Sequence, residues 1–277
     1  MVVVRFKLTI EYTGTRYSGW QIQKNARTIQ GEIDRAVRAV TGRGDFELYG
    51  AGRTDAGVHA VAQVAHLDVV TDVPPASLVR RINDELPADI NVLAAAAVPH
   101  RFHARYDAVA RRYVYQLARR RTAFAKAYVW WVKDPLDLTA MGEAAHAFVG
   151  MRDFRRLAEH EARDRSDPDA ARSTTVLVER LEIVEDGDLV LVGIEGSHFL
   201  WKMVRRLTGV LVEIGRGRLD PGSARRLVEE GGAPAAAALT APPSGLFLER
   251  VYYEQDARGT AFRAITPLPR VVRQGLR

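Results

Sequence analysis

Hydrophobic and polar residues alternate along the first segment of the chain, residues 2–12. Alternation places every second side chain on the same face, so the pattern predicts a strand with one buried face. A polar loop with two glycines and Trp20 follows. Apolar residues then recur at spacings of three and four between Ile29 and Val40, which predicts a helix that ends near Gly42.

Further elements follow within the first hundred residues. Apolar runs predict three strands, near 46–51, 58–70 and 90–98. A helix is expected to begin at Pro74-Pro75 and to end before Pro87. The order strand, helix, strand, strand, helix, strand is that of the split βαβ, or ferredoxin-like, arrangement.

The same order recurs in the rest of the chain. Strands are predicted near 111–118, 174–185, 188–195 and 246–253, and helices near 137–149 and 203–214. We therefore predict an α+β protein of two ferredoxin-like halves, with antiparallel sheets joined around a central active-site cleft. The predicted domains are residues 1–105 and 106–255, followed by a peripheral tail, residues 256–277. The charged segment 160–173 and the Gly/Pro/Ala-rich segment 231–245 are expected to be irregular.

Composition narrows the class of protein. The chain has 277 residues, of which 47% are hydrophobic and 27% are charged, as in folded proteins with a sizeable core. No apolar run approaches the roughly 20 residues of a membrane-spanning helix, and the N-terminus has no apolar signal segment. We therefore expect a cytoplasmic protein with no membrane partner.

Metal and thiol chemistry are not expected. The sequence has no cysteine, which excludes disulfides, thiolate nucleophiles and cysteine-based zinc sites. The seven histidines have no recognised metal-binding spacing, so no metal is predicted.

The net charge of +6 is unevenly distributed along the chain. Between residues 101 and 121, Asp107 alone opposes seven arginines, namely Arg101, Arg105, Arg111, Arg112, Arg119, Arg120 and Arg121. We call these seven residues the arginine cluster. Such a cluster is typical of proteins that bind a polyanion, because guanidinium groups bind phosphate. A solvated basic face is the other interpretation, and on a strand Arg111 and Arg112 are expected to point to opposite sides.

The stretch YGAGRTDAGVHAVAQV, residues 49–64, places Arg53 and Asp55 between glycines at the junction of two predicted strands. One interpretation is a simple β-turn, because Asp bonds its own backbone and Gly57 accepts a positive φ. The other is a reactive carboxylate, because a neighbouring Arg keeps Asp ionised and suited to act as a nucleophile or base. The stretch alone leaves both open.

Two further groups of side chains are candidates. Tyr113 and Tyr115 share one face of the predicted strand 111–118, and packing within the sheet explains Tyr115. Lys202, Arg205 and Arg206 are expected on the face of the 203–214 helix opposite its apolar stripe, where solvent exposure alone explains them.

Six stretches, in order along most of the chain, resemble the tRNA pseudouridine synthase A (TruA) family. They are EYTGTRYSGWQIQ (11–23), TIQGEI (28–33), GAGRTDAGVHAVAQVAHL (50–67), RFHARYDAVARRYVYQL (101–117), GSHFLWKMVRRLTGVLVEIGRGRL (196–219) and TAPPSGLFLERVYY (240–253). The GRTDAGVHA block is highly specific, and the other stretches are individually moderate. The chain departs from the family at residues 151–156, MRDFRR, where the usual segment reads His-Asp-Phe with small residues.

The resemblance implies an enzyme that isomerises uridine to pseudouridine at positions 38, 39 and 40 in the anticodon stem-loop of tRNA. Because an isomerisation gains and loses no group, no cofactor is implied. By motif position, Asp55 is the expected catalytic carboxylate. The same resemblance implies that Arg53 and Arg205 bind RNA and pair with or orient Asp55. Tyr113 is expected to stack on the target base and to help remove the C5 proton. A homodimer that binds tRNA and flips the target base out of its stack is also implied.

Two other classes remain open on the residues themselves. A non-catalytic RNA-binding protein is compatible with ferredoxin-like sheets, and an altered Asp55 would favour it, but Asp55 is present. A glycosidase or nucleosidase usually needs a second carboxylate that acts as an acid, and none is evident near the motif.

Overall fold

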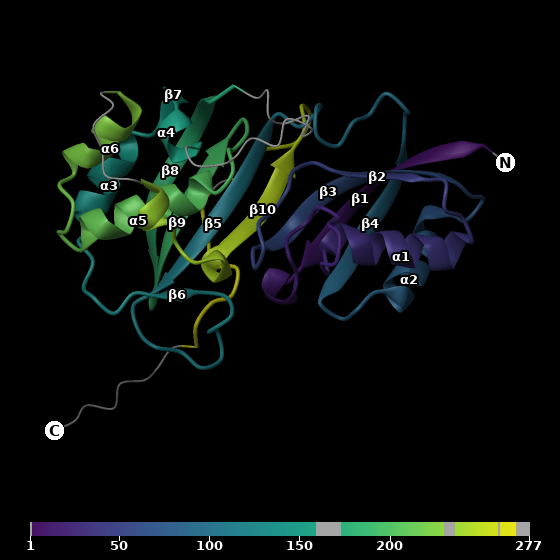
Figure 1. Cartoon of the computed structure of the whole chain (residues 1–277), viewed down its shortest axis with the longest axis horizontal. Helices are drawn as coiled ribbons and strands as arrows, with labels where there is room; N and C mark the ends of the chain where they lie inside the picture. Colours follow the sequence, from purple (N-terminus) through teal and green to yellow (C-terminus); the bar gives the residue numbers. More distant parts are fainter. Residues whose placement is uncertain (1, 159–172, 230–235, 260, 270–277) are drawn as a thin grey trace. The chain divides into compact units, whose positions relative to one another are not determined.

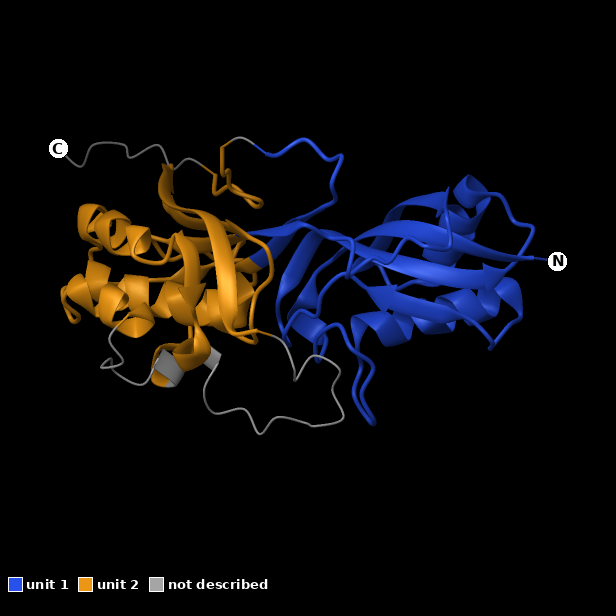
Figure 2. Ribbon diagram, turned by 90° about the horizontal axis from the view of Figure 1, so that it is seen from above, with its two compact units in different colours: residues 1–113, 247–259 blue, residues 114–246, 260–277 orange. Residues whose placement is uncertain are grey.

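The computed structural model describes residues 2–158, 173–229, 236–259 and 261–269. The chain divides into two compact units, which Figure 2 colours separately. Unit 1 comprises Met1–Tyr113 and Phe247–Gly259, and unit 2 comprises Val114–Leu246 and Thr260–Arg277. The domain boundaries predicted from the sequence stay a prediction, and each unit is described by itself below.

Unit 1 contains the first predicted set of elements. In chain order they are β1 (Val3–Tyr12), the 3-10 helix η1 (Gly14–Arg16), α1 (Ile29–Thr41), β2 (Glu47–Gly50), β3 (His59–Val70), α2 (Pro75–Glu85) and β4 (Ile90–Val98). The antiparallel order is β4-β1-β3, and β2 pairs with β3 on its other edge. This is the ferredoxin-like order, so the prediction for the first half is confirmed. Strand β10 (Leu246–Tyr252) pairs in parallel with β3 at Phe247–His59.

Local chemistry explains the boundaries of α1, which lies beside α2 in Figure 1. The Thr28 side chain accepts a hydrogen bond from the Gly31 N–H and caps the first turn. Gly42, at φ 66°, ends the helix in the left-handed conformation that glycine adopts without strain. Ile29 and Ile33 are fully buried on the inner face, as the helical spacing predicted.

Unit 2 contains the second set. Strand β5 (Ala110–Ala118) begins in unit 1 and continues into unit 2, where the strand order is β5-β9-β8-β7 (Figure 1). The other elements are β6 (Trp130–Trp131), α3 (Leu138–His146), β7 (Gly150–Asp153), α4 (Arg155–Ala158), β8 (Thr175–Asp186), β9 (Leu189–Gly196), α5 (Met203–Gly215), α6 (Gly222–Val228) and the 3-10 helices η2 (Ala236–Leu239) and η3 (Pro243–Gly245). The predicted strands and helices are present, and the α+β class is confirmed. The periodicity of apolar residues did not predict β6, β7, α4 and α6, because these elements are too short to show a period.

The segments predicted to be irregular are only partly described. Of the charged segment 160–173, only Ser173 lies within the described residues. Of the segment 231–245, residues 236–245 are described, and they include η2 and η3. None of the described helices is long and apolar enough to cross a membrane.

The prediction that Arg206 lies on an exposed face of α5 is wrong. Helix α5 is buried around most of its circumference, and Arg206 is 3% exposed. Its guanidinium donates to the Leu157 carbonyl and lies 5.3 Å from the centre of the Trp201 ring. Lys202 precedes the helix, at φ 54°, with its Nζ 3.6 Å from the centre of the same ring. These cations therefore pack against protein instead of forming an exposed basic face.

Residues 261–269, part of the segment expected to be a peripheral tail, pack into the core of unit 2. Phe262 is buried among apolar residues of β5 and β9, including Val114 and Leu191. The Gln116 side chain, which is fully buried, accepts from the Ile265 N–H and donates to the Thr266 hydroxyl. Residues 261–269 are thus held by both apolar packing and a buried amide.

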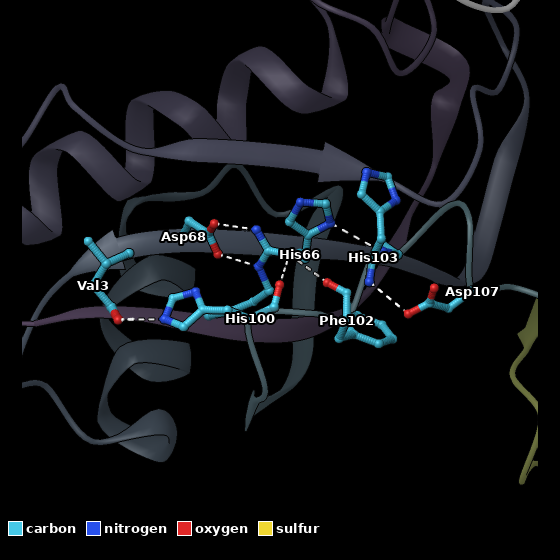
Figure 3. Close-up of polar contacts among 9 residues, drawn as sticks. Val3, His66, Asp68, His100, Phe102, His103 and Asp107 are labelled. Carbon is cyan, nitrogen blue, oxygen red and sulfur yellow. Dashed lines mark hydrogen bonds and ion pairs between the residues drawn. The ribbon is translucent and has the colours of Figure 1, made fainter.

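Three histidines of unit 1 are drawn in Figure 3: His66 on β3, and His100 and His103 in the 100–107 segment. The buried His66 Nδ1 accepts from the Ala104 N–H at 3.2 Å, and its Nε2 has no hydrogen-bond partner among the described residues. The centre of the His66 ring lies 4.7 Å from the centre of the His103 ring and 5.8 Å from that of the Tyr49 ring. Burial, with the nearby charge of Arg5, lowers the pKa of His66 to about 4.

We expect His66 to make the fold sensitive to acid. Its folded pKa of about 4 lies below the ordinary 6.5, so the unfolded chain binds the extra proton. Stability that is present above pH 6.5 should therefore be lost as the pH falls toward 4. His66→Phe should flatten this part of the stability–pH profile, measured by urea unfolding at a series of pH values.

The control for this variant is His100→Gln, because His100 is exposed on the same unit. It should keep the parental pH dependence. A His66→Phe protein with the parental slope between pH 4 and 6.5 would show that other groups cause the acid sensitivity.

Candidate active site

The turn between β2 and β3 presents Asp55. The Val58 N–H donates to the Asp55 carbonyl at 3.1 Å, and Gly57 has a φ of 79°. A positive φ at the third position is what a type II turn requires, and it explains the glycine. The stretch therefore forms a β-turn, over residues 55–58, which leaves the Asp55 side chain half-buried and Arg53 exposed. This turn is compatible with both interpretations of the stretch.

A second loop, residues 13–20, packs against this turn. The Trp20 N–H donates to the Thr54 carbonyl at 3.1 Å, and the Gly57 N–H donates to the Tyr17 carbonyl at 3.3 Å. A Cβ on Gly14 would lie 1.9 Å from the Val58 carbonyl oxygen. A Cβ on Gly19 would lie 2.5 Å from the Thr54 carbonyl oxygen. The two backbones thus touch at points where no side chain fits.

Hydrogen bonds with residues of β1 and β3 fix the turn that carries Asp55. The Tyr12 and Thr54 hydroxyls are hydrogen-bonded at 2.8 Å, and both residues are buried. The buried Gln63 side chain donates to the Gly52 carbonyl at 2.9 Å. The Ala51 N–H donates to the Val64 carbonyl at 2.7 Å. Asp55 therefore stands on a turn that is fixed on both sides of it.

Tyr113 lies on β5 in the same unit and is 9% exposed. Burial raises the pKa of its phenol to about 12, the Arg111 cation opposes that rise, and the Asp55 carboxylate adds to it. The charge of Asp55 thus acts on the Tyr113 hydroxyl. The phenol is protonated at neutral pH, because its pKa lies above the ordinary value of 10.

Arg205 lies in unit 2, on the first turn of α5. Its Nε donates to the Ala241 carbonyl at 2.8 Å, and the Ala241 N–H donates to the Arg205 carbonyl at 3.1 Å. Tyr115 lies within reach of its charge: burial raises the pKa of Tyr115 and Arg205 opposes the rise. The Tyr115 hydroxyl donates to the Pro242 carbonyl, and the fully buried ring confirms the packing role predicted for it.

The members of the arginine cluster differ in exposure. Arg101, Arg119 and Arg121 are exposed, as both interpretations of the cluster require. Arg105, Arg111 and Arg112 are buried, so they form neither a solvated face nor a phosphate-binding surface. Arg119 and Arg120 pair with Glu185 and Asp188 on the β8–β9 hairpin. The two interpretations considered only the charges near one another along the chain. In the fold, several of these arginines pair with acceptors that are distant in sequence.

The family model described as tRNA pseudouridine synthase matches residues 8–107 and 144–254. This match covers most of the chain and includes the turn with Arg53 and Asp55, as well as Arg205. The chain belongs to this family.

Individual relatives agree with the family model, and three proteins named tRNA pseudouridine synthase A illustrate this. That of Rhodopseudomonas palustris is 40% identical over 253 residues, which cover 90% of this chain and 99% of that protein. That of Citrifermentans bemidjiense is 39% identical over 251 residues, with 90% and 97% covered. That of Agrobacterium fabrum is 38% identical over 254 residues, with 90% and 92% covered.

Among solved structures, a chain of a Cbf5-Nop10-Gar1 complex aligns with 74% of this chain and 54% of its own length. The TM-score is 0.27 and the sequence identity is 14%. This likeness is too low to carry any conclusion.

Sequence reasoning missed several residues that support the turn in this member of the tRNA pseudouridine synthase family. Gln63 interrupts the apolar run 60–65 of β3, and this mismatch is a signal that is visible in the sequence. Tyr12 and Thr54 gave no such signal, because their hydroxyls meet only through the pairing of β1 with β3. The described residues contain no group of three or more acidic residues or histidines that could hold a metal ion.

We expect Gly14→Ala to destabilise the protein by about 1–3 kcal/mol, because its Cβ would overlap the Val58 carbonyl oxygen. Chemical denaturation would measure the loss. Gly52→Ala is the matched control on the turn itself, because a Cβ there meets nothing within 4 Å. Its effect should stay within about 0.5 kcal/mol. Equal losses in the two variants would contradict the importance of the close approach at Gly14.

Proposed function

We propose that this protein isomerises uridine to pseudouridine in tRNA, at positions 38, 39 and 40 of the anticodon stem-loop, with Asp55 as the catalytic carboxylate. The observation that carries the proposal is the rigid turn that presents Asp55 within electrostatic range of Tyr113. Family membership supports the reaction, because the relatives named above are matched over nearly their whole length.

The chemistry requires one nucleophile or base and no outside reactant. The N1–C1′ bond of uridine breaks, the uracil turns, and a C5–C1′ bond forms. The proton on C5 is lost and N1 gains one, so atoms and electrons balance without an oxidant. Asp55 either attacks C1′ or removes a proton from the sugar to form a glycal. Both routes need a carboxylate whose position is fixed relative to the sugar.

Tyr113 supplies a ring and a hydroxyl whose pKa the charge of Asp55 affects. The ring gives a face on which the flipped uracil can stack. Because burial raises the pKa of the phenol to about 12, no phenolate is available at neutral pH to act as a ready base. If the hydroxyl accepts the C5 proton, it must pass its own proton on, and Asp55 is the carboxylate whose charge reaches it.

Arg53 and Arg205 have different roles in the proposal. Arg53 is exposed two residues before Asp55, where it can meet a phosphate of the tRNA. Arg205 is held by Ala241 at the start of α5, and we assign it to RNA binding. The working form that we propose is a cytoplasmic homodimer, with one tRNA spanning both subunits.

Asp55→Asn should abolish pseudouridine formation and leave tRNA binding nearly unchanged. The amide keeps the size of the carboxylate but is neither a nucleophile nor a base, whereas affinity for RNA comes mainly from phosphate contacts. Tritium release from tRNA labelled at C5 of uridine measures turnover, and a gel-shift titration measures binding. Asp72→Asn, at an exposed site of the same unit, is the control and should keep full turnover. Near-parental turnover by Asp55→Asn would refute the assignment of Asp55.

Tyr113→Phe should bind tRNA normally and release tritium at least about 100-fold more slowly, because the hydroxyl is lost and the ring remains. With a pKa of about 12, the phenol should give the parent no ascending limb near pH 10 in a single-turnover pH profile. Tyr115→Phe, on the same strand, is the control and should keep the parental rate. An unchanged rate in Tyr113→Phe would leave stacking as the only role of Tyr113.

A further inference from the structure

Arg111 lies on β5, two residues before Tyr113, and the two side chains leave the strand on the same side. The residue is 7% exposed. A buried guanidinium in this position needs several acceptors, because it carries five N–H donors and stays charged.

Backbone carbonyls of two other segments supply those acceptors. The Nη1 atom donates to the Ala108 carbonyl at 2.9 Å, and the Nη2 atom donates to the Arg105 carbonyl at 2.8 Å. The Nη2 atom also donates to the Ala51 carbonyl at 3.0 Å. One side chain therefore joins β5, the 105–108 segment and the first residue after β2.

The contact with Ala51 reaches the turn that carries Asp55. The Ala51 N–H is bound to the Val64 carbonyl, so Arg111 fixes the opposite end of the same residue. Further along the turn, the Gly52 carbonyl accepts from Gln63 and the Thr54 carbonyl accepts from Trp20. Arg111 thus provides a side-chain link between this turn and the strand that carries Tyr113.

We propose that Arg111 is a positioning residue, which fixes the turn of Asp55 relative to Tyr113 through the Ala51 carbonyl. The effect of this positioning role on catalysis rests on the function proposed above. A misplacement of about 1 Å between reacting groups costs on the order of 100-fold in rate. Burial raises the pKa of the Tyr113 phenol, and the charge of Arg111 opposes this rise. The effect of Arg111 agrees with the proximity of the two side chains.

Arg112 provides a matched control within the same strand. It is also buried, at 1% exposed, but leaves β5 on the other side. Its Nε atom donates to Glu249 at 2.8 Å and its Nη1 atom to the Gly259 carbonyl at 3.4 Å. The two variants Arg111→Lys and Arg112→Lys each keep a buried charge and lose guanidinium hydrogen bonds, and only the first touches the turn.

The test compares these variants in the full-length protein by three measurements. Arg111→Lys should lower the single-turnover rate at saturating tRNA by about 100-fold. It should leave the tRNA dissociation constant near the parental value, and it should speed amide hydrogen exchange in residues 50–58 by about tenfold. Arg112→Lys should keep the parental rate and the parental exchange in residues 50–58, whatever its melting temperature.

Three results would overturn the proposal. Weaker tRNA binding with an unchanged rate would make Arg111 an RNA contact. Equal rate losses in the two variants would make its role a general one in folding. Unchanged exchange in residues 50–58 would show that Arg111 does not hold the turn.

Two provisions separate a positioning role of Arg111 from a failure to fold and from a failure of the proposed function. If circular dichroism shows that Arg111→Lys does not fold, Arg111→Gln replaces it and is held to the same expectations, because a neutral amide leaves no buried charge unpaired. A parent that forms no pseudouridine would refute the proposed function, whereas the hydrogen-exchange comparison tests the positioning role without any turnover.

Discussion

The contact between two backbones, at Gly14 and Gly19 on one side and Thr54 to Val58 on the other, is the constraint on which the site depends. At both glycines a Cβ would lie within 2.5 Å of a carbonyl oxygen. This approach lets the Trp20 N–H reach the Thr54 carbonyl and the Tyr17 carbonyl reach the Gly57 N–H. Gly14 and Gly19 therefore have a structural reason that does not depend on any property of the substrate.

Hydrogen bonds to its carbonyl groups also hold the turn that carries Asp55. The carbonyls of Ala51, Gly52, Thr54 and Asp55 each accept a hydrogen bond, from Arg111, Gln63, Trp20 and Val58 respectively. A carboxylate on such a turn is positioned before the substrate arrives, so little reorganisation is needed during the reaction. The buried, neutral phenol of Tyr113 adds an apolar face beside this charge.

The sequence predicted the fold well where one periodicity extended over a whole element. Strand β1 alternates over ten residues, and α1 has both a capping Thr28 and a terminating Gly42. For the site, the glycine-flanked motif and the resemblance to a family led to the assignment of Asp55 and Tyr113, which stays a prediction. Short elements such as β7 and α4 were missed, since four residues do not show a period.

The errors concern arginines and the end of the chain. Arg111, Arg112 and Arg206 read as exposed cations because Arg is usually at the surface. Each is buried, and each donates to a backbone carbonyl distant in sequence, which no local pattern reveals. Phe262 was overlooked because a single apolar residue in an irregular segment has no period, although it fills the core of unit 2.

Site-resolved mapping of pseudouridine in tRNA is the most direct measurement of the proposed activity. Unmodified tRNAs with uridine at positions 38, 39 or 40, incubated with the full-length protein alone, should acquire pseudouridine at those positions. No added metal or nucleotide should be required. A protein that leaves these uridines unmodified, or that modifies uridines only elsewhere in the tRNA, would contradict the proposal.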